Sequence, residues 1–436
     1  MITPLLLALS LSPWWTVYGD KELDALVERA ISANLDVKTA AARIAESRAL
    51  AGQARSQLLP AVNVTSSASR LRGGFQQGIA RIPTSPGAAQ SGSFVAPFET
   101  GLFQGGLDMR WELDFWGANR AGRGASLQDL ASQIELRDDM ALIVSAEVVR
   151  AYVELQGFGD RIAITARSRD AQKELLDLTS SRAEAGLASQ LDVERQRALL
   201  ENTEAAIPPL EAERTIRRNH LAVLLGDSAA TVTVNGRPLQ APLLPAVLDS
   251  ELLKRRPDVR AAEVRITAAL SRLKQARTDL FPKIVLNGLV GRQSTSLGGL
   301  SLGGGNFFNL APQLQLPIFS GGRIRQQIAA QDARVEQARL DYQKEILAAF
   351  EEAANAIAGY QRQQERAVKL SAASESASRS LELSRELATA GLGDFLTVLD
   401  AQRTVLDAEF QKSAAGTAAL VESVLLHKAL AGGWSR

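Results

Sequence analysis

The stretch QARSQLLP at residues 53–60 returns as QARTDLFP at residues 275–282, and this repeat is the strongest structural signal in the chain. Further matches follow in the same order: residues 113–120 (LDFWGANR) with residues 316–323 (LPIFSGGR), and the AGL of residues 185–187 with that of residues 390–392. A motif early in the chain is separated from its repeat by more residues than a later motif is from its own. The first copy therefore holds a longer loop between its matched segments. Two similar halves predict a pseudo-symmetric structure.

The composition excludes several functional classes. The chain has 49 Lys and Arg residues against 48 Asp and Glu residues, so it lacks the basic excess typical of proteins that bind nucleic acid. It has no cysteine, which excludes disulfides and thiolate metal sites, and its two histidines are too few for a histidine metal cluster. Since no nucleophile–base arrangement or cofactor motif is present, we expect no catalytic residues, no cofactor and no metal.

Alternating polarity predicts four β-strands. In residues 107–115, Leu107, Met109 and Trp111 alternate with charged residues, and this is the clearest strand signal in the chain. Residues 62–67, 284–290 and 310–318 show the same period. The Gly-rich segments at residues 72–106 and 294–306 are predicted as loops.

Long helices surround these strands. We predict a helix over residues 20–59 that ends at Pro60, and a proline-free helix from Gly117 to a turn at residues 185–189. A second helix follows that turn and is broken at Pro208 and Pro209. In the second half, a helix from about residue 249 ends at Pro282, and a long helix runs from residue 321 to a turn at residues 390–394. We therefore expect an N-terminal segment at residues 1–19, repeats at residues 20–226 and 249–436, and a link at residues 227–248.

This pattern predicts a membrane channel of the α+β class. Strands of about 9–11 residues suit a transmembrane β-strand. Four strands cannot close a barrel, and lipid does not tolerate an open sheet edge, so several chains would share one barrel. The helices would then extend into water as a tube. Periodicity alone also fits a soluble coiled-coil scaffold, which stays open as an alternative.

Motifs spread over the chain point to one family. They are Trp14-Trp15 with Tyr18-Gly19-Asp20, IPPLE at residues 207–211, LAVLLG at residues 221–226, RRPDVRAAE at residues 255–263, LPIFSGGR at residues 316–323 and LDAQR at residues 399–403. In this order they resemble the TolC-type outer-membrane efflux proteins of the OprM/NodT-like branch.

The resemblance implies a homotrimer in the outer membrane of a Gram-negative bacterium, in contact with outer-membrane lipid. Three protomers would form a twelve-stranded β-barrel and a long periplasmic α-helical barrel, with the link at residues 227–248 in an equatorial region. The implied partners are a periplasmic adaptor protein and an inner-membrane transporter of the RND type. The chain would be the exit duct for drugs or other small toxic compounds; a type I secretion duct is the alternative.

The N-terminus departs from the branch. Members of this branch typically carry a lipoprotein signal and an acylated cysteine, and this chain has no cysteine. The short apolar stretch at residues 5–11 resembles a signal-peptide core but lacks a basic flank and a clear cleavage site. We interpret residues 1–19 as a candidate export-signal remnant, with a misassigned start as the alternative, and lipidation stays open.

The resemblance also assigns three groups of site residues. The first would form a constriction at the closed periplasmic tip, although a packed helix seam is the alternative. The second would be turns that dock the adaptor, and the third would be aromatic residues at the membrane interface or, alternatively, core residues. The groups are Leu396, Asp400 and Arg403; Ala185, Gly186, Leu187, Ala390, Gly391 and Leu392; and Trp111, Phe115, Phe307 and Phe308.

Overall fold

The protein is described by a computed structural model that covers residues 13–77, 94–228, 239, 255–297, 300–390, 392 and 395–431. The chain divides into two compact units. Unit 1 comprises Met1–Glu46, Leu130–Arg265 and Ala338–Arg436, and unit 2 comprises Ser47–Asp129 and Ile266–Gln337. Each unit therefore combines segments from both halves of the sequence.

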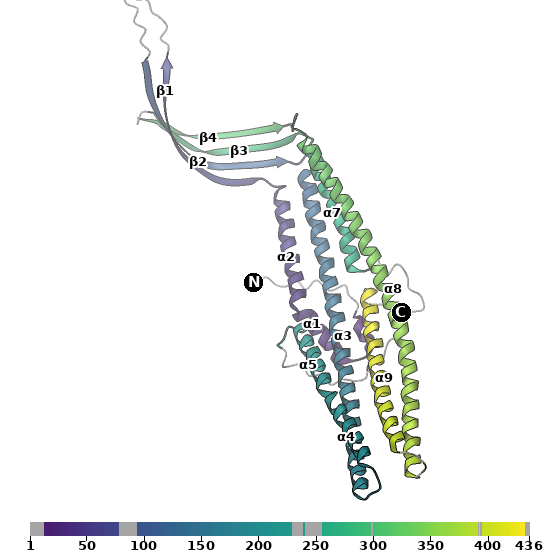
Figure 1. Ribbon diagram of the computed structural model, residues 1–436. Coiled ribbons are helices and arrows are strands. Elements are labelled where there is room, and N and C mark those ends of the chain that lie inside the picture. The colour runs from purple at the N-terminus through teal and green to yellow at the C-terminus, as the bar shows by residue number, and fades with distance from the viewer. Residues whose placement is uncertain are drawn as a thin grey trace, which may run out of the picture. The chain divides into compact units, whose positions relative to one another are not determined.

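Unit 2 contains one antiparallel sheet with the strand order β1-β2-β3-β4 (Figure 1). Its strands are β1 (Ala61–Gln77), β2 (Phe94–Leu113), β3 (Lys283–Leu297) and β4 (Leu300–Gln315). The β2–β3 pairing joins the hairpin of the first half to that of the second, with a register from Thr100 opposite Leu297 to Leu113 opposite Ile284. The four strands were predicted, and the sheet order confirms that they assemble together.

The two predicted Gly-rich loops are largely wrong, because strand pairing continues through them. Residues 72–77 and 94–106 belong to β1 and β2, and residues 294–297 and 300–306 belong to β3 and β4. A Cβ atom on Gly106 would lie 2.4 Å from the carbonyl oxygen of Val290, directly beside Gly291. Glycine here permits a close backbone approach between strands rather than marking a turn.

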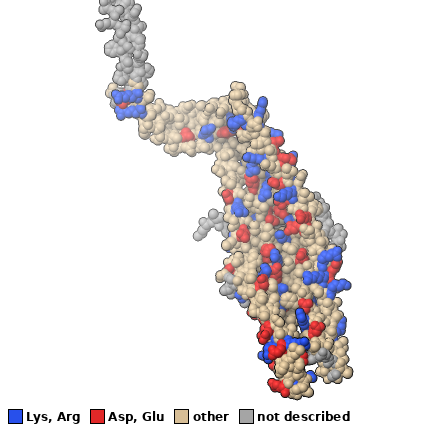
Figure 2. Space-filling view, viewed as in Figure 1, with Lys and Arg blue, Asp and Glu red and all other residues tan. Residues whose placement is uncertain are grey.

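Over the part of the sheet that adjoins the helices in sequence, one face is mostly apolar and the other mostly polar. Nearer the hairpin ends, Arg70, Arg72, Glu99 and Arg292 lie on the apolar face. Side chains of paired residues lie on the same face, so the register extends each face across all four strands. Figure 2 shows few charged residues over most of the sheet and both signs of charge over the helices. The apolar face carries Val62, Val64, Leu107, Met109, Trp111, Leu286, Val290, Phe308, Leu310 and Leu314; the polar face carries Asn63, Thr65, Asp108, Arg110, Asn287, Gln293, Asn309, Gln313 and Gln315.

The internal repeat is present in the helices. Helices α2 (Leu35–Ser56) and α7 (Pro257–Thr278) both have 22 residues and start as far apart as the two QAR motifs. Helices α3 (Ala118–Glu184) and α8 (Arg323–Thr389) both have 67 residues and start as far apart as the two AGL turns. The glycine before each long helix, Gly117 or Gly322, has a positive φ of 80° or 84°. The long proline-free helices of the prediction are thus confirmed.

Two shorter features refine the predicted helices. The expected single helix over residues 20–59 is two helices, α1 (Lys21–Ala33) and α2, because Asn34 interrupts it and accepts hydrogen bonds from the backbone N–H groups of Asp36 and Val37. The predicted break at Pro208 is confirmed between α4 (Gln190–Ala205) and α5 (Ile207–Leu224). Helix α9 (Phe395–Ala429) follows the second turn. Most of the link at residues 227–248, and the expected helix start near residue 249, lie outside the described residues.

The 3₁₀ helix η1 (Trp14–Tyr18) packs into the hydrophobic core of unit 1. The Trp14 ring stacks on His427 of α9 with 5.1 Å between centroids, and its Nε1 donates a hydrogen bond to Ser145 of α3. The Tyr18 hydroxyl lies 2.7 Å from Ser423 Oγ of α9. The WW…GD motif therefore has a structural role: it ties the N-terminal segment to α3 and α9 at once.

Candidate functional site

The two predicted helix–helix turns have matching backbone geometry. Gly186 adopts a positive φ of 75°, as expected for the residue after a helix C-cap. The Leu187 N–H donates to the Arg182 carbonyl at 2.7 Å and the Gly186 N–H to the Ala183 carbonyl at 3.0 Å, which together form a Schellman motif. At the second turn, the Leu392 N–H donates to the Leu387 carbonyl at 2.9 Å, at the equivalent position. Gly391 lies outside the described residues.

Each turn presents an exposed leucine. Leu187 is 71% exposed and Leu392 is 79% exposed. In a Schellman motif the residue at this position often packs back onto its own helix, and these two side chains instead remain largely accessible. The neighbouring Ala185 and Ala390 complete the turns by donating to Ser181 and Glu386 of the preceding helices. Each turn thus presents an apolar side chain, Leu187 or Leu392, to solvent.

The predicted constriction residues share one face of α9, which we call the exposed stripe. Leu396 is 41% exposed, and Asp400 and Arg403 are also exposed, at helical positions i, i+4 and i+7. The opposite face is buried, so the packed seam lies on the other side of the helix; it carries Val398, Leu399, Ala401 and Gln402.

The four aromatic candidates lie in different environments. Trp111 and Phe308 lie on the apolar face of the sheet, while Phe307 lies on the polar face because adjacent strand residues point in opposite directions. Trp111 is partly buried and its Nε1 donates to the Leu58 carbonyl at 3.1 Å. Phe115 follows β2 and is 62% exposed. Of the four, only Trp111 and Phe308 share the apolar face, and the interfacial girdle stays a prediction.

Sequence reasoning missed a buried arginine that joins three helices of unit 1. Arg256, only 8% exposed, precedes α7 and donates to the Ala429 carbonyl of α9 at 3.0 Å. Its Nη2 also contacts Asp258 Oδ2 and Glu352 Oε2, both at 2.7 Å. Burial opposes ionisation of Glu352, but the hydrogen bonds from Arg256 and Lys428 outweigh it and lower its pKa. The signal available in the sequence was the RRPD motif, in which arginine directly precedes a proline-initiated helix.

The first half contains an equivalent contact with different chemistry. Asn34, the counterpart of Arg256 at the spacing of the two QAR motifs, donates from Nδ2 to the Leu224 carbonyl at 3.0 Å. Leu224 in turn is the counterpart of Ala429 at the spacing of the two AGL turns. In each half, therefore, a side chain just before a 22-residue helix holds a carbonyl at the end of that half's last helix.

A further acidic side chain lies beside the Arg256 cluster. Asp139 of α3 is partly buried, and burial, reinforced by the Asp258 carboxylate, raises its pKa to about 6. Arg256 and Lys428 counteract this rise only in part. Three acids, Asp139, Asp258 and Glu352, thus share two bases in this region.

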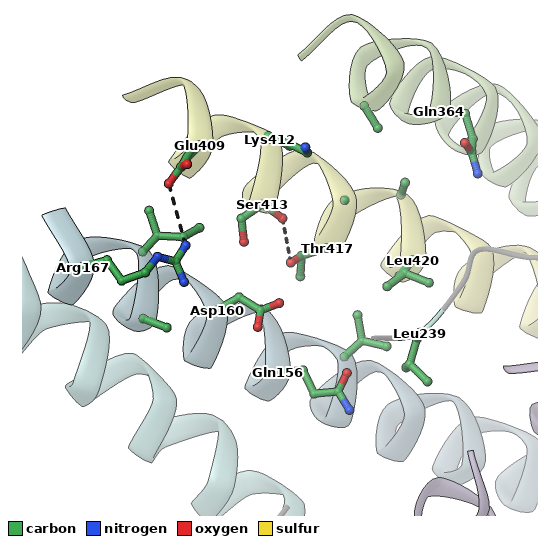
Figure 3. A pocket seen from close by; sticks show the side chains of 17 residues that line it. Gln156, Asp160, Arg167, Leu239, Gln364, Glu409, Lys412, Ser413, Thr417 and Leu420 are labelled. Carbon is green, nitrogen blue, oxygen red and sulfur yellow. Dashed lines mark hydrogen bonds and ion pairs between the residues drawn. The ribbon is translucent and has the colours of Figure 1, made fainter. Parts of the chain in front are cut away.

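A groove in unit 1 runs between α3, α8 and α9 and has a volume of about 560 Å³ (Figure 3). Its charged lining residues have mixed signs: Asp160 and Glu409 against Arg167 and Lys412. Arg167 and Glu409 form an ion pair at 3.8 Å, drawn as a dashed line in Figure 3. The other lining residues are small, apolar or neutral polar residues. This lining is typical of the solvent-facing surface between packed helices rather than of a catalytic site.

Among the helices that the structure describes, none has an apolar stretch long enough to cross a membrane. The family model of the outer membrane efflux proteins matches residues 26–227 and 248–432. The pyoverdine export outer membrane protein OpmQ of Pseudomonas aeruginosa is 32% identical over 430 residues, which cover 97% of this chain and 87% of that protein.

Solved structures agree with this match. The outer-membrane channel OprN superposes with a TM-score of 0.83 at 32% identity, covering 98% of this chain and 94% of the other. The MtrE outer membrane channel of Neisseria gonorrhoeae superposes with a TM-score of 0.81 at 27% identity, covering 94% of this chain and 89% of the other. The chain therefore belongs to the outer membrane efflux protein family, whose members are channels, not enzymes, of the Gram-negative outer membrane with a helical periplasmic tunnel.

Proposed function

We propose that three copies of this chain form the exit duct of a tripartite efflux pump with an inner-membrane transporter of the RND type. The observation that carries the proposal is the four-stranded sheet. It has an apolar and a polar face over the part that adjoins the helices in sequence, and no strand beyond β1 or β4 in the described chain. Lipid requires every strand edge to be paired, so several sheets must join. Three sheets would give a twelve-stranded barrel with its apolar face toward lipid and its polar face toward the pore.

The mass of the purified particle tests this assembly. The protein extracted from outer membranes in mild detergent should have the mass of three chains, each of 46.7 kDa, after the bound detergent is subtracted. A monomer of unchanged helical content would refute the trimer. Membership of the efflux family already removes the soluble coiled-coil scaffold as an alternative.

The exposed leucines at the turns support docking of a periplasmic adaptor. An exposed apolar side chain at a turn is a suitable anchor for a partner helix, because its burial in a pocket of the partner removes apolar surface from water. We expect Leu187→Asp combined with Leu392→Asp to abolish adaptor pull-down and efflux while leaving the channel folded. Leu178→Asp on α3, which replaces a 53% exposed leucine away from the turns, is the matched control. Equal loss in both variants would argue against docking at the turns.

The exposed stripe of α9 supports a gate. Three Asp400 carboxylates around a common axis would favour cations, and Leu396 one turn earlier would narrow the same opening. Arg403 would hold the closed state by pairing with an acid of a neighbouring protomer. Single-channel recording in planar bilayers tests this: Asp400→Ala should raise conductance and reduce cation selectivity. Glu201→Ala, an exposed acid on α4, is the control, and unchanged currents for Asp400→Ala would remove it from the gate.

The cargo class follows from the relatives and is open to test. Their names include pyoverdine export and toluene efflux, so small molecules rather than proteins are the proposed cargo. Deletion should raise sensitivity to dyes and solvents and leave protein secretion intact. A secretion defect with unchanged dye sensitivity would favour the type I secretion duct instead.

A further inference from the structure

Charged side chains are divided unequally between the two faces of the sheet. In the described strands, the polar face carries acids and bases in equal number, whereas the apolar face carries three arginines and one glutamate. Those on the polar face are Asp108, Arg110, Glu112 and Lys283; those on the apolar face are Arg70, Arg72, Glu99 and Arg292. We call Arg70, Arg72 and Arg292 the arginine patch. The face that otherwise avoids charge is thus the one with an excess of positive charge.

The arginine patch lies toward the end of the sheet that is farther from the helices in sequence. Arg72 lies opposite Glu99, near the start of β2, whereas α3 follows Leu113 at the other end of that strand. Figure 2 shows basic side chains gathered at this end of the sheet. In a channel whose helices lie in the periplasm, this end of the sheet belongs to the outer leaflet of the membrane.

The depth of the patch can be estimated from the strand geometry. From Leu113 to Gly101, the partner of Arg70, β2 rises about 40 Å along the strand at about 3.3 Å per residue. A strand tilt of about 40° reduces this to about 30 Å in height, whereas the apolar band of a membrane barrel is about 25 Å tall. Arg70 and Arg72 therefore lie beyond the hydrocarbon. Arg292 starts lower on β3, and its long side chain can extend toward the lipid headgroups.

We propose that the arginine patch binds the headgroup phosphates of an anionic lipid in the outer leaflet. This inference rests on the proposed barrel, whose apolar face would contact lipid. A guanidinium forms paired hydrogen bonds with phosphate oxygens and remains charged beside hydrocarbon. Lipid phosphates are the anions that a basic side chain meets at this depth of a membrane. The polar face would line the pore instead, and its acids and bases balance.

The surface around the arginines is open to a headgroup. Arg70, Arg72 and Arg292 are all exposed. Gly105 lies between Arg292 and Ser66 across the strands, and a Cβ atom on Gly105 would meet nothing within 4 Å. The Ser66 hydroxyl shares this face and can donate a further hydrogen bond to a phosphate oxygen.

Glu99 is the one acid of the described strands on this face, and it leaves Arg70 available. Glu99 pairs with Arg70 at 2.8 Å, and the Arg70 side chain is 76% exposed. An exposed ion pair of this kind contributes about 0–1 kcal/mol, so a phosphate group can compete for the guanidinium.

The spacing of the arginines favours a headgroup with two phosphate groups. Arg70 and Arg72 are two residues apart on one strand, so their Cα atoms are about 7 Å apart and the two side chains can share a phosphate. Arg292 lies two strands away and four residues lower, which places its Cα about 16 Å from that of Arg70. It would bind the second phosphate.

A lipid titration of the full chain, purified in mild detergent, tests the site. The probe is lipid A, whose headgroup carries two phosphate groups, and zwitterionic phosphatidylcholine is the comparison. Lipid A should raise the melting temperature, and phosphatidylcholine should not. Arg72→Gln combined with Arg292→Gln, which leaves the pair of Arg70 with Glu99 in place, should require about tenfold more lipid A for half of the shift.

The matched control removes the same charge from the other face. Arg110→Gln combined with Lys283→Gln replaces two exposed basic residues of the polar face and should respond to lipid A like the wild type. Equal responses of the two double variants would overturn the lipid site. An equal shift with phosphatidylcholine, or with inorganic phosphate in place of lipid, would also overturn it.

The mass of the same particle separates this inference from the proposed assembly. A particle of three chains in which the two double variants respond alike overturns the lipid site and leaves the proposed duct intact. A particle of one chain contradicts the proposed trimer, and the comparison of the two double variants in that particle still decides whether the patch binds lipid.

Discussion

Replacing Arg256 with alanine should destabilise unit 1 strongly. The guanidinium donates to the Ala429 carbonyl at 3.0 Å, to both carboxylate oxygens of Asp258, and to Glu352 at 2.7 Å. Without it, two acids and one helix-end carbonyl each lose a donor in a partly buried region. Arg256 therefore links α7, α8 and α9 through one side chain.

The loss of stability in Arg256→Ala depends on how exposed the two acids, Asp258 and Glu352, are to solvent. Removing one partner of a buried ion pair costs about 3–5 kcal/mol. The side chains of Asp258 and Glu352 are 22% and 34% exposed, and Lys428 still contacts Glu352 at 3.1 Å, which relieves part of the penalty. We therefore expect about 3 kcal/mol for Arg256→Ala, at the lower end of that range. Arg256→Lys keeps the charge but loses the forked geometry and should cost about 1–2 kcal/mol.

Urea unfolding of the detergent-solubilised protein, followed by far-ultraviolet circular dichroism, measures this effect. The neighbouring Arg255 is exposed, so Arg255→Ala is a matched control and should change stability by less than about 0.5 kcal/mol. A double-mutant cycle with Glu352→Gln should show a coupling energy of about 0.5–3 kcal/mol. Equal urea midpoints for Arg255→Ala and Arg256→Ala, or additive effects in the cycle, would refute the reasoning.

Three further predictions concern other buried contacts. Folding raises the pKa of Asp139 from 3.8 to about 6, so the ionised carboxylate destabilises the protein increasingly as the pH rises from 3.8, and fully above 6. Asp139→Asn should therefore add on the order of 2–3 kcal/mol to the free energy of unfolding at pH 7 and much less at pH 4. An equal gain at both pH values would contradict this. Burial lowers the pKa of His427 from 6.5, so the wild type should lose stability as the pH falls below 6.5, and His427→Gln should flatten that loss in thermal melts between about pH 5 and 7. Gly157→Ala would place a Cβ 2.2 Å from Thr417 Oγ1 and should lower the stability of the protein by about 1–3 kcal/mol. The control Gly159→Ala meets only Arg214, at 4.0 Å, and should raise the stability by up to about 1 kcal/mol. Similar melting temperatures for the two variants would show that α3 and α9 can separate at Gly157.

Local patterns predicted the elements that depend on local physics. Alternation along residues 107–113 predicts a strand because one face of the sheet is apolar, and the missing prolines after Gly117 predict a long helix. The same local reasoning failed at Gly106 and Gly291. There the glycines serve a contact between strands from opposite halves of the sequence, which a local rule for turns cannot detect.

The candidate site shows the same division. The spacing of Leu396, Asp400 and Arg403 predicts a common helix face, and the structure places all three on the exposed side of α9. The consecutive residues Phe307 and Phe308 could have been assigned to opposite faces from the strand period alone. The RRPD motif marks Arg256, but its partners Glu352 and Ala429 could not be predicted, because they lie 96 and 173 residues further along the chain.

The two halves hold equivalent positions by different interactions, and this difference has a physical consequence. Asn34 uses a neutral amide to reach the Leu224 carbonyl, while Arg256 uses a buried charge to reach the Ala429 carbonyl. The Asn34 contact does not depend on the ionisation of any partner. The Arg256 contact does: the pKa of Glu352 is lowered in the folded state, so its stabilisation is complete above the unfolded value of 4.5 and is lost as the pH falls below it. Acid should therefore loosen the second half's helix junction before the first half's, although the repeat gives both junctions the same backbone plan.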